Sequence, residues 1–213
     1  MKRIALLVAF AVQVSFSQNI TIHHTYYTTV FSESLRVPVV VKWWLTKEMV
    51  SCVTHLKRTN KFTADPELKA QTNLARDYAK SGYDRGHNMP ADDNACSAIG
   101  MKECFYYSNM CPQTPRLNRG AWKSLETYCR KLAKQYDSVL VWCGSVCKSG
   151  KTIGPDKVAV PDYSWKVVYV KKTGETYAYS FKNDDSETKP ITSYQVGVDS
   201  VEHLSRMKFI ASK

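Results

Sequence analysis

WKVVYVKKTGETYAYSF, residues 165–181, contains two runs of apolar, β-branched and aromatic residues on either side of the polar segment KKTGE. Each run has the length and composition of a β-strand, and the short connection contains Gly174, so the pattern predicts an antiparallel hairpin. Similar runs at 37–45, 105–107 and 139–143 predict further strands. Strands outnumber long helices and do not alternate strictly with them, which indicates an α+β fold with a mainly antiparallel central sheet flanked by helices.

The clearest helical segment extends from about Asn118 to Tyr136, where apolar residues recur at spacings of three and four. Pro115 precedes this segment and Asp137 follows it. A short helix is expected at 199–204. No internal repeat or linker divides the chain after the first 17 residues, so we expect residues 18–213 to form a single domain.

The composition is that of an ordinary globular domain with a strongly basic balance. Of 213 residues, 44% are hydrophobic and 23% charged, which argues against a disordered chain. Thirty Lys and Arg against 19 Asp and Glu give a formal net charge of +11. Such an excess predicts a polyanionic partner such as nucleic acid, a glycosaminoglycan or an anionic membrane surface; the alternative is a basic surface that only maintains solubility.

The first 17 residues differ from the rest of the chain. Lys2 and Arg3 precede an apolar run from Ile4 to Val14, and small residues follow at 15 and 17. This is the pattern of a cleaved secretory signal peptide, so we expect a secreted or periplasmic protein. The run is too short to span a bilayer, and no membrane insertion is expected.

All seven cysteines lie in the predicted mature chain, and in an oxidising compartment they predict disulfides. Because their number is odd, at least one thiol is left without a partner in the same chain. Cys143 and Cys147 bracket a turn-like insert and are candidates for a pair. A zinc site is the alternative; we expect none, on the interpretation that the sequence contains neither a C-x-x-C pair nor a C-x-x-H near the cysteines.

His87 is the leading candidate for chemistry. It follows Arg85 and Gly86 in a segment, 81–90, that contains two glycines and a proline and is expected to be irregular or hairpin-like with an exposed backbone. A neutral imidazole there can accept a proton from water near neutral pH. Arg85 offers a planar cation that suits phosphate oxygens, and Asp84 can orient its neighbours.

A second candidate cluster lies on the predicted helix. On a straight helix Glu126 lies about 12 Å along and about 80° around from Asn118, so the two side chains cannot both bind one ion directly. An amide oxygen with water molecules suits Mg²⁺, and the carboxylate can then hold the water of its shell. Glu126 and Arg130 are one i, i+4 step apart. At this spacing they can form an ion pair, and the alternative interpretation is a solvated helix face that carries only this pair.

Three segments, in this order and spacing, carry a family resemblance: SGYDRGH (81–87), SNMCPQ (108–113) and LNRGAWKSLE (117–126). They closely resemble the DNA/RNA non-specific endonucleases, a family that includes secreted bacterial nucleases and mitochondrial endonuclease G. The resemblance covers residues 58–145 well and, more loosely, the strands up to Phe181 and the segment 199–209. It implies an active site of the ββα-metal, or His-Me finger, type.

The resemblance also implies residue roles. His87 corresponds to the general base, Asn118 to the direct Mg²⁺ ligand, with Mn²⁺ as a possible substitute, and Glu126 to the residue that holds water of the metal's shell. Asn109 corresponds to a neighbour that helps to fix the base or that shell.

Two arginines, Arg85 and Arg130, correspond to phosphate clamps. A further upstream arginine of the family is not placed cleanly, because Arg58 and Lys61 are both candidates.

The function implied is a secreted sugar-non-specific endonuclease that hydrolyses DNA and RNA with Mg²⁺ and leaves 5′-phosphate ends. A nuclease of the H-N-H type is a rival that His87-Asn88 suggests, but no second histidine follows before His203. A different class of function is a secreted nucleic-acid or heparin-binding protein on an inactive nuclease scaffold. The sequence leaves open the DNA or RNA preference, the oligomeric state and any protein inhibitor.

Overall fold

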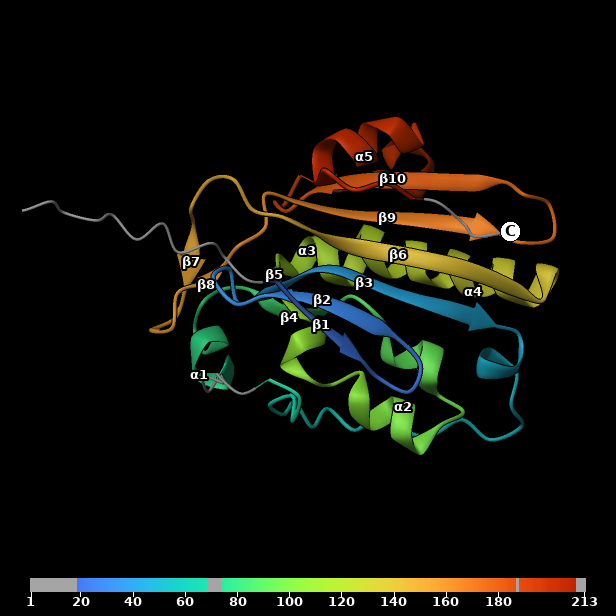
Figure 1. The fold of residues 1–213 in the computed structure, drawn as a ribbon, viewed down its shortest axis with the longest axis horizontal. Helices are drawn as coiled ribbons and strands as arrows, with labels where there is room; N and C mark the ends of the chain where they lie inside the picture. The colour runs from blue at the N-terminus through green and yellow to red at the C-terminus, as the bar shows by residue number, and fades with distance from the viewer. Residues whose placement is uncertain (1–18, 69–73, 187, 210–213) are drawn as a thin grey trace, which may run out of the picture.

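The computed structural model describes residues 19–68, 74–186 and 188–209, so the predicted leader at 1–17 lies outside the described residues. Within them, a sheet of seven antiparallel strands has the order β1-β2-β3-β6-β9-β10-β11 (Figure 1). Its strands are β1 (Asn19–His23), β2 (Thr28–Ser32), β3 (Val37–Thr46), β6 (Ser138–Val146), β9 (Tyr163–Val170), β10 (Thr176–Lys182) and β11 (Gln195–Val196). The α+β fold with an antiparallel central sheet is confirmed.

Shorter elements complete the described part of the chain. Two small antiparallel pairs are β4 (Asp84–His87) with β5 (Met110–Gln113) and β7 (Thr152–Ile153) with β8 (Val158–Ala159). The α-helices are α1 (Leu74–Tyr78), α2 (Ala98–Glu103), α3 (Pro115–Leu117), α4 (Lys123–Tyr136) and α5 (Val198–Ser205). Single turns are η1 (Glu48–Val50), η2 (Ala91–Asn94), η3 (Tyr107–Asn109), the π-helical η4 (Asn118–Trp122) and η5 (Ile191–Tyr194).

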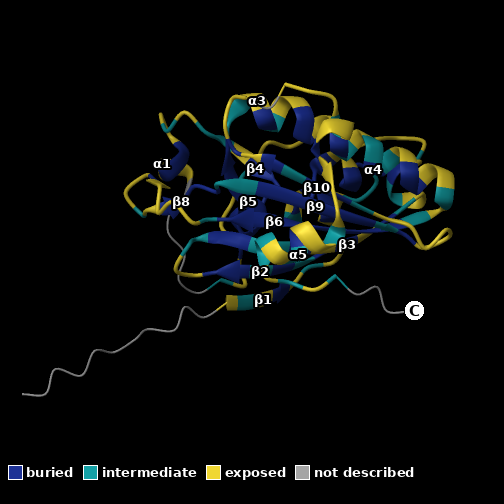
Figure 2. Cartoon of the chain, turned by 90° about the horizontal axis from the view of Figure 1, so that it is seen from above, coloured by how far each residue is buried: buried dark blue, intermediate teal, exposed yellow. Residues whose placement is uncertain are grey.

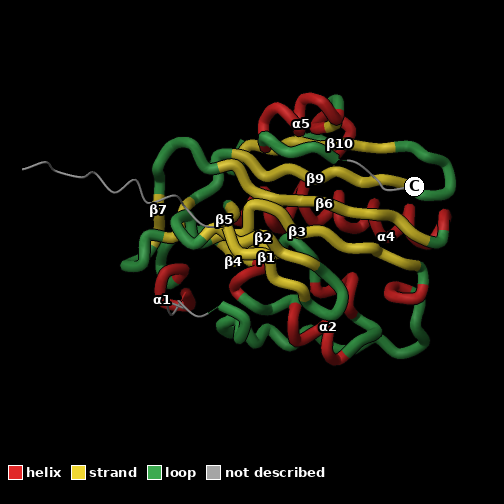
Figure 3. The backbone as a smooth tube through the Cα atoms, in the orientation of Figure 1, coloured by secondary structure: helices red, strands yellow, loops and turns green. Residues whose placement is uncertain are grey.

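The sheet is covered on both faces, as Figures 2 and 3 show from two directions. Alternate residues of the predicted hairpin β9–β10 explain why: Val168 and Val170 pack toward α4, whereas Trp165 and Val167 pack toward α5. One apolar core therefore lies between the sheet and α4, and a second lies between the sheet and α5 with the segment that follows it. No described helix is both long and apolar enough to span a bilayer.

The strands β3 and β6 are neighbours, although the chain between them is long. Thr46 at the end of β3 is paired with Ser138 at the start of β6, and the Lys47 amide donates to the Asp137 carbonyl at 2.8 Å. The chain thus leaves the central sheet after Thr46 and rejoins it at Ser138, directly beside the point of departure. We call the intervening residues 47–137 the excursion. All the candidate site residues belong to the excursion, on the face of the sheet that α4 covers.

The predicted helix 118–136 is interrupted. Gly120, with φ −107° and ψ −107°, lies outside helical geometry within the π-helical turn η4, so Asn118 precedes a kink and Glu126 follows it. The straight-helix estimate of how these two side chains are related does not apply, because kinks of this kind occur where a π-bulge breaks the regular ladder.

The strand predicted at 105–107 is wrong. Phe105 and Tyr106 precede the turn η3, and the strand begins only at Met110. Phe105, Tyr106 and Tyr107 are all buried instead of alternating between two faces, so their aromatic character reflects packing in the interior. The segment 81–90 is also not exposed throughout, because Gly86 and His87 are buried within β4.

One disulfide joins Cys52 and Cys96, which confirms the expectation of at least one. Cys143 and Cys147 are both free thiols. Because β6 stays extended to Val146, four residues of strand separate the two by roughly 13 Å, beyond the reach of a disulfide. The proposed pair is therefore wrong.

Candidate active site

Close packing of β4 against β5 positions His87. Gly86 pairs with Cys111 and His87 with Met110 across the ladder. A Cβ atom on Gly86 would lie 2.2 Å from the Gln113 side-chain oxygen, so only glycine allows this approach. The family-like glycine before the histidine thus has a local structural cause.

His87 is buried, with 6% of its surface exposed. The rings of Phe62 and Phe105 contact it edge-on, with centroids 5.6 and 4.9 Å away. A hydrogen bond to the Arg85 backbone occupies one ring nitrogen, whereas Nε2 has no partner. Burial, and then the charge of Arg58, lowers the pKa of His87 to about 3, so its imidazole is neutral at physiological pH with a free lone pair.

Two arginines lie near His87, each with its guanidinium over one of the two phenylalanine rings that contact the imidazole. The Arg85 guanidinium is exposed and lies 4.2 Å from the Phe62 centroid. The Arg58 guanidinium lies 4.9 Å from the Phe105 centroid. Of the two upstream candidates, Arg58 is therefore the cation beside His87, and it comes from a coil segment whose sequence carries no periodic signal.

Asn118 is joined to the other end of β4. Its side-chain nitrogen donates to Asp84 at 2.9 Å, and Arg119 binds both oxygens of the same carboxylate at 2.7 and 2.8 Å. Partial burial acts in the opposite direction, but these contacts keep the pKa of Asp84 below its ordinary value. The indole nitrogen of Trp122 donates to the His87 carbonyl at 3.1 Å. Both ends of β4 are thus fixed to the kinked helix, which brings His87 and Asn118 into one ββα unit.

Asn109 is fully buried and hydrogen-bonded at both ends of its amide. Its nitrogen donates to the carbonyls of Met89 and Cys104 at 2.9 and 2.8 Å, and its oxygen accepts from the Met89 amide at 2.9 Å. These bonds hold the chain directly after His87. The amide group of Asn109 is therefore fully used by hydrogen bonds to the backbone of Met89 and Cys104.

Glu126 and Arg130 lie further along α4 in a network of buried charges. Arg130 donates to Asp93 at 3.1 Å and lies 3.7 Å from Asp92. Burial raises the pKa of Asp93 to about 6, although Arg130 opposes this effect. Burial likewise raises the pKa of Glu126 to about 7. The ion pair predicted between Glu126 and Arg130 is replaced by the pair of Arg130 with Asp93.

Lys166, a fully buried lysine among these charges, was not predicted from the sequence. Its ammonium lies 4.3 Å from the Trp122 ring centroid and 5.6 Å from that of Trp43. Burial lowers the pKa of Lys166, but the surrounding thiols and the carboxyls of Glu126 and Asp93 outweigh burial and raise it. A signal existed, because Lys166 occupies an inward-facing position of the strand WKVVYV.

The donor set fits a hard divalent cation. With its nitrogen bonded to Asp84, the Asn118 amide presents its carbonyl oxygen, which accepts no hydrogen bond from the described residues. The half-buried Glu126 carboxylate likewise has no hydrogen-bond donor among them. Amide and carboxylate oxygens with room for water are the ligands that Mg²⁺ prefers.

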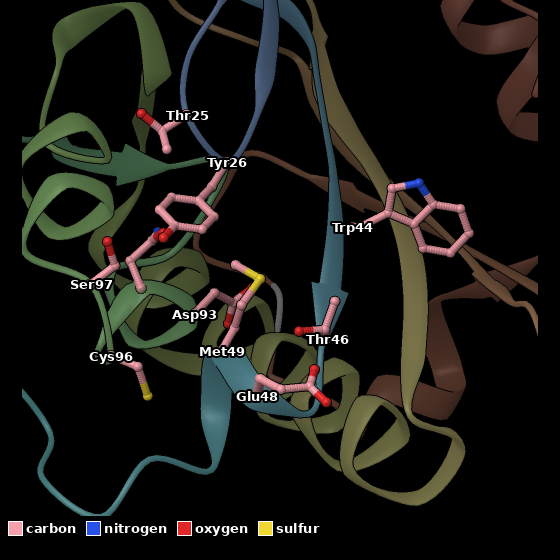
Figure 4. Close-up of a pocket in the computed structure, with 10 residues that line it drawn as sticks. Thr25, Tyr26, Trp44, Thr46, Glu48, Met49, Asp93, Cys96 and Ser97 are labelled. Atoms are coloured by element: carbon pink, nitrogen blue, oxygen red, sulfur yellow. The ribbon is translucent and has the colours of Figure 1, made fainter.

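A cavity of about 570 Å³ lies elsewhere in the molecule (Figure 4). Tyr26, Trp44 and Met49 contribute to its lining, and of the charged network described above only Asp93 reaches it. Neither His87 nor Asn118 lines this cavity.

Comparisons with known proteins agree with this geometry. The profile described as "DNA/RNA non-specific endonuclease" matches residues 7–212. The chain belongs to the DNA/RNA non-specific endonuclease family. The crystal structure of an EndoG/EndoGI complex superimposes with a TM-score of 0.82 at 30% identity, covering 90% of this chain and 86% of that one. Both the resemblance and the fold it implied are confirmed.

Proteins of known function that are similar to this chain are also named as nucleases. "Nuclease 1, mitochondrial" of Schizosaccharomyces pombe is 32% identical over 87% of this chain and 64% of its own length. Human "Endonuclease G, mitochondrial" is 35% identical over 63% of this chain and 50% of its own length. The chain thus spans half to two thirds of the length of these relatives. The expectation of a secreted or periplasmic protein is wrong, because these relatives are named as mitochondrial nucleases.

Proposed function

We propose that the protein is a metal-dependent endonuclease that hydrolyses phosphodiester bonds of DNA and RNA without selecting bases, through a single domain at 18–213. The observation that carries the proposal is the neutral His87, whose free Nε2 lies in the same ββα unit as the free carbonyl oxygen of Asn118. Family membership supports nuclease chemistry, and the positive net charge of +11 suits a polyanionic substrate.

His87 acts as the general base. The hydrogen bond to the Arg85 backbone fixes the ring orientation, so that Nε2 accepts a proton from the attacking water. Asn109 acts as a positioning residue that holds the backbone after His87.

Asn118 and Glu126 hold the metal site, with Asn118 as the direct ligand and Glu126 as the acceptor for water of the metal's shell. When bound, Mg²⁺ or Mn²⁺ supplies charge neutralisation at the phosphate and at the leaving oxygen. Asp84, itself bound by Arg119, holds the Asn118 amide through its nitrogen and leaves the amide oxygen available as a ligand. Loss of the 3′ oxygen as the leaving group gives 5′-phosphate ends.

Arg85 is the arginine best placed to bind phosphate directly, because its guanidinium is exposed beside the histidine. Arg130 contributes positive charge from within its pair with Asp93. Because these groups address backbone phosphate and not base edges, we propose little sequence preference.

A nucleic-acid binder without turnover is the second candidate, and the charge alone is equally consistent with it. The two candidates differ in one assay. Purified protein is incubated with supercoiled plasmid and, separately, with single-stranded RNA, with Mg²⁺ or with EDTA. The proposal expects both substrates to be cut in Mg²⁺ and neither in EDTA.

A His87→Ala variant serves as the matched control, because it retains the metal-binding residues. It should bind the plasmid but leave it intact. Intact plasmid and RNA with the unmodified protein in Mg²⁺ would instead support the binding function.

A further inference from the structure

A second cluster of metal-ligating side chains lies outside the candidate active site. Among the described residues, Cys52, His55 and Cys96 place one ligand atom each within 4.8 Å of one another. The two cysteines form the disulfide, and His55 is exposed beside it. Cys52 and His55 have C-x-x-H spacing, so the expectation that no C-x-x-H lies near the cysteines is wrong.

The two segments that carry these ligands are held together by more than the disulfide. The Leu56 amide donates to the Ala95 carbonyl at 2.8 Å, directly beside His55 and Cys96. On the other side, Ser97 caps the start of α2 by accepting from the Gly100 amide at 3.1 Å. The hydrogen bond between Leu56 and Ala95 thus joins the two segments independently of the disulfide.

Two thiolates and an imidazole are typical zinc ligands, and a three-residue set leaves a fourth position for water. With zinc–sulfur bonds of about 2.3 Å, the sulfurs of a tetrahedral site lie about 3.8 Å apart. Conversion of the disulfide to such a site thus requires a small separation of the two side chains. Exposure of His55 places the fourth position toward solvent.

We propose that Cys52, His55 and Cys96 form a zinc site that is available only when the Cys52–Cys96 disulfide is reduced. A dithiol reductant supplies two electrons and two protons, is itself oxidised to a disulfide, and leaves two thiols on the protein. Zinc binding then displaces both thiol protons to solvent. Disulfide and zinc are two alternative links between the same two segments, and His55 has a role only in the second.

The link has a defined position relative to the candidate active site. Arg58, which lies over the Phe105 ring beside His87, follows His55 by three residues. Either the disulfide or the zinc ion therefore anchors the chain segment that carries Arg58. The zinc site and the nuclease function are nevertheless independent, and each can fail without the other.

The test compares oxidised full-length protein with protein reduced by a phosphine, each incubated with zinc chloride and desalted. We expect about one zinc ion per chain bound only after reduction, as a Cys₂His set requires. Cobalt in place of zinc should give a thiolate-to-metal charge-transfer band. The band should disappear in Cys52→Ser and Cys96→Ser, and cobalt affinity should fall at least tenfold in His55→Ala.

Matched controls are Cys147→Ser, which removes a thiol that is free in this structure, and His203→Ala, which removes an exposed histidine elsewhere. Both should bind metal as the unmodified protein does. A readout without substitutions is alkylation of the reduced protein, in which zinc should slow the modification of Cys52 and Cys96 specifically. Equal zinc uptake by oxidised and reduced protein, or unprotected Cys52 and Cys96, would overturn the proposal.

Discussion

Burial gives His87 a stability cost in acid. Its folded pKa of about 3 is below the ordinary value near 6.5, so between these values the unfolded chain takes up a proton that the folded protein does not. The free energy of unfolding therefore decreases as pH falls through this window; the contribution of neutral His87 is fully present above about 6.5 and is lost progressively down to about 3.

We expect this histidine alone to account for a loss of about 2 kcal/mol between pH 7 and pH 5. The measurement is urea unfolding of the unmodified protein and of His87→Gln at both pH values. Between pH 7 and pH 5 the free energy of unfolding should fall by about 2 kcal/mol less in the variant than in the unmodified protein. Contributions of Asp93 and Glu126 are common to both proteins and cancel in this difference. Equal losses would contradict the low pKa.

His87 and Asn118 are expected to fail in different ways. His87→Ala removes the proton acceptor and should lower turnover by about 10² to 10⁴ without weakening metal binding. Asn118→Ala removes a ligand from a shell that is otherwise mostly water, so high Mg²⁺ should recover part of its activity. Cleavage rates against Mg²⁺ concentration decide the matter: rescue of His87→Ala but not of Asn118→Ala would show that the two roles are reversed.

Substitution of Arg130 is expected to affect stability, whereas substitution of Arg85 is expected to affect nucleic-acid binding. Arg130 is 15% exposed at its side chain and its partner Asp93 only 1%, so Arg130→Ala leaves a buried carboxyl without its cation and should destabilise by about 3 to 5 kcal/mol. Arg85→Ala should change stability little. It should instead reduce the slope of log affinity against log salt by about 0.9 on duplex DNA. Urea unfolding and salt-dependent binding measure the two effects, and similar stabilities for the two variants would refute the contrast.

At the scale of elements, the contact of β4 with β5 depends on the missing Cβ of Gly86. Gly86→Ala should destabilise by about 1 to 3 kcal/mol because the new methyl group meets Gln113. Gln113→Ala provides the control, since it makes room for that methyl group. The double variant should be less destabilised than the sum of the two single variants, and strictly additive losses by thermal or urea unfolding would count against the steric explanation.

Elements with a clear period could be predicted from sequence, and elements shaped by tertiary contacts could not. The hairpin 165–181 alternates, so both of its strands were recovered. The kink at Gly120 and the buried run 105–107 have no such signature, because a π-turn and a fully enclosed aromatic run depend on the surrounding packing. For the same reason the sequence could not decide between Arg58, which lies in a coil, and Lys61, and Lys166 was not singled out in its strand.

For the whole molecule, the disulfide closes a long loop that contains β4. Cys52 and Cys96 are 44 residues apart, and in the chain-entropy view a loop of this length contributes about 4 kcal/mol. Cys52→Ser should therefore lower the free energy of unfolding of the oxidised protein in EDTA by about 2 to 5 kcal/mol. Cys147→Ser is the control and should change it little. Urea unfolding that does not distinguish the two variants would show that the closed loop is not a source of stability.

The motifs supplied candidate site residues but not the residues that contact them from other elements. His87 and Asn118 could be found because they lie within local strings, whereas Asp93 contacts Arg130 from another element. Pairings of the seven cysteines also escaped prediction, since spacing along the chain does not give distance in the fold. What sequence supplied was the chemistry, and what it lacked was the arrangement of the groups around it.

The paired Thr46 and Ser138 give the excursion a property that a protein engineer would use. Both junctions of residues 47–137 lie side by side in one rung of the sheet, so two family members could exchange this segment as a cassette by cutting each chain at only two adjacent points. The cassette would have to keep the apolar face of α4 that fills the core, but no strand of the host sheet would need a new neighbour. Chimeras joined at this rung would therefore allow catalytic properties to be transplanted between homologues on an unchanged scaffold.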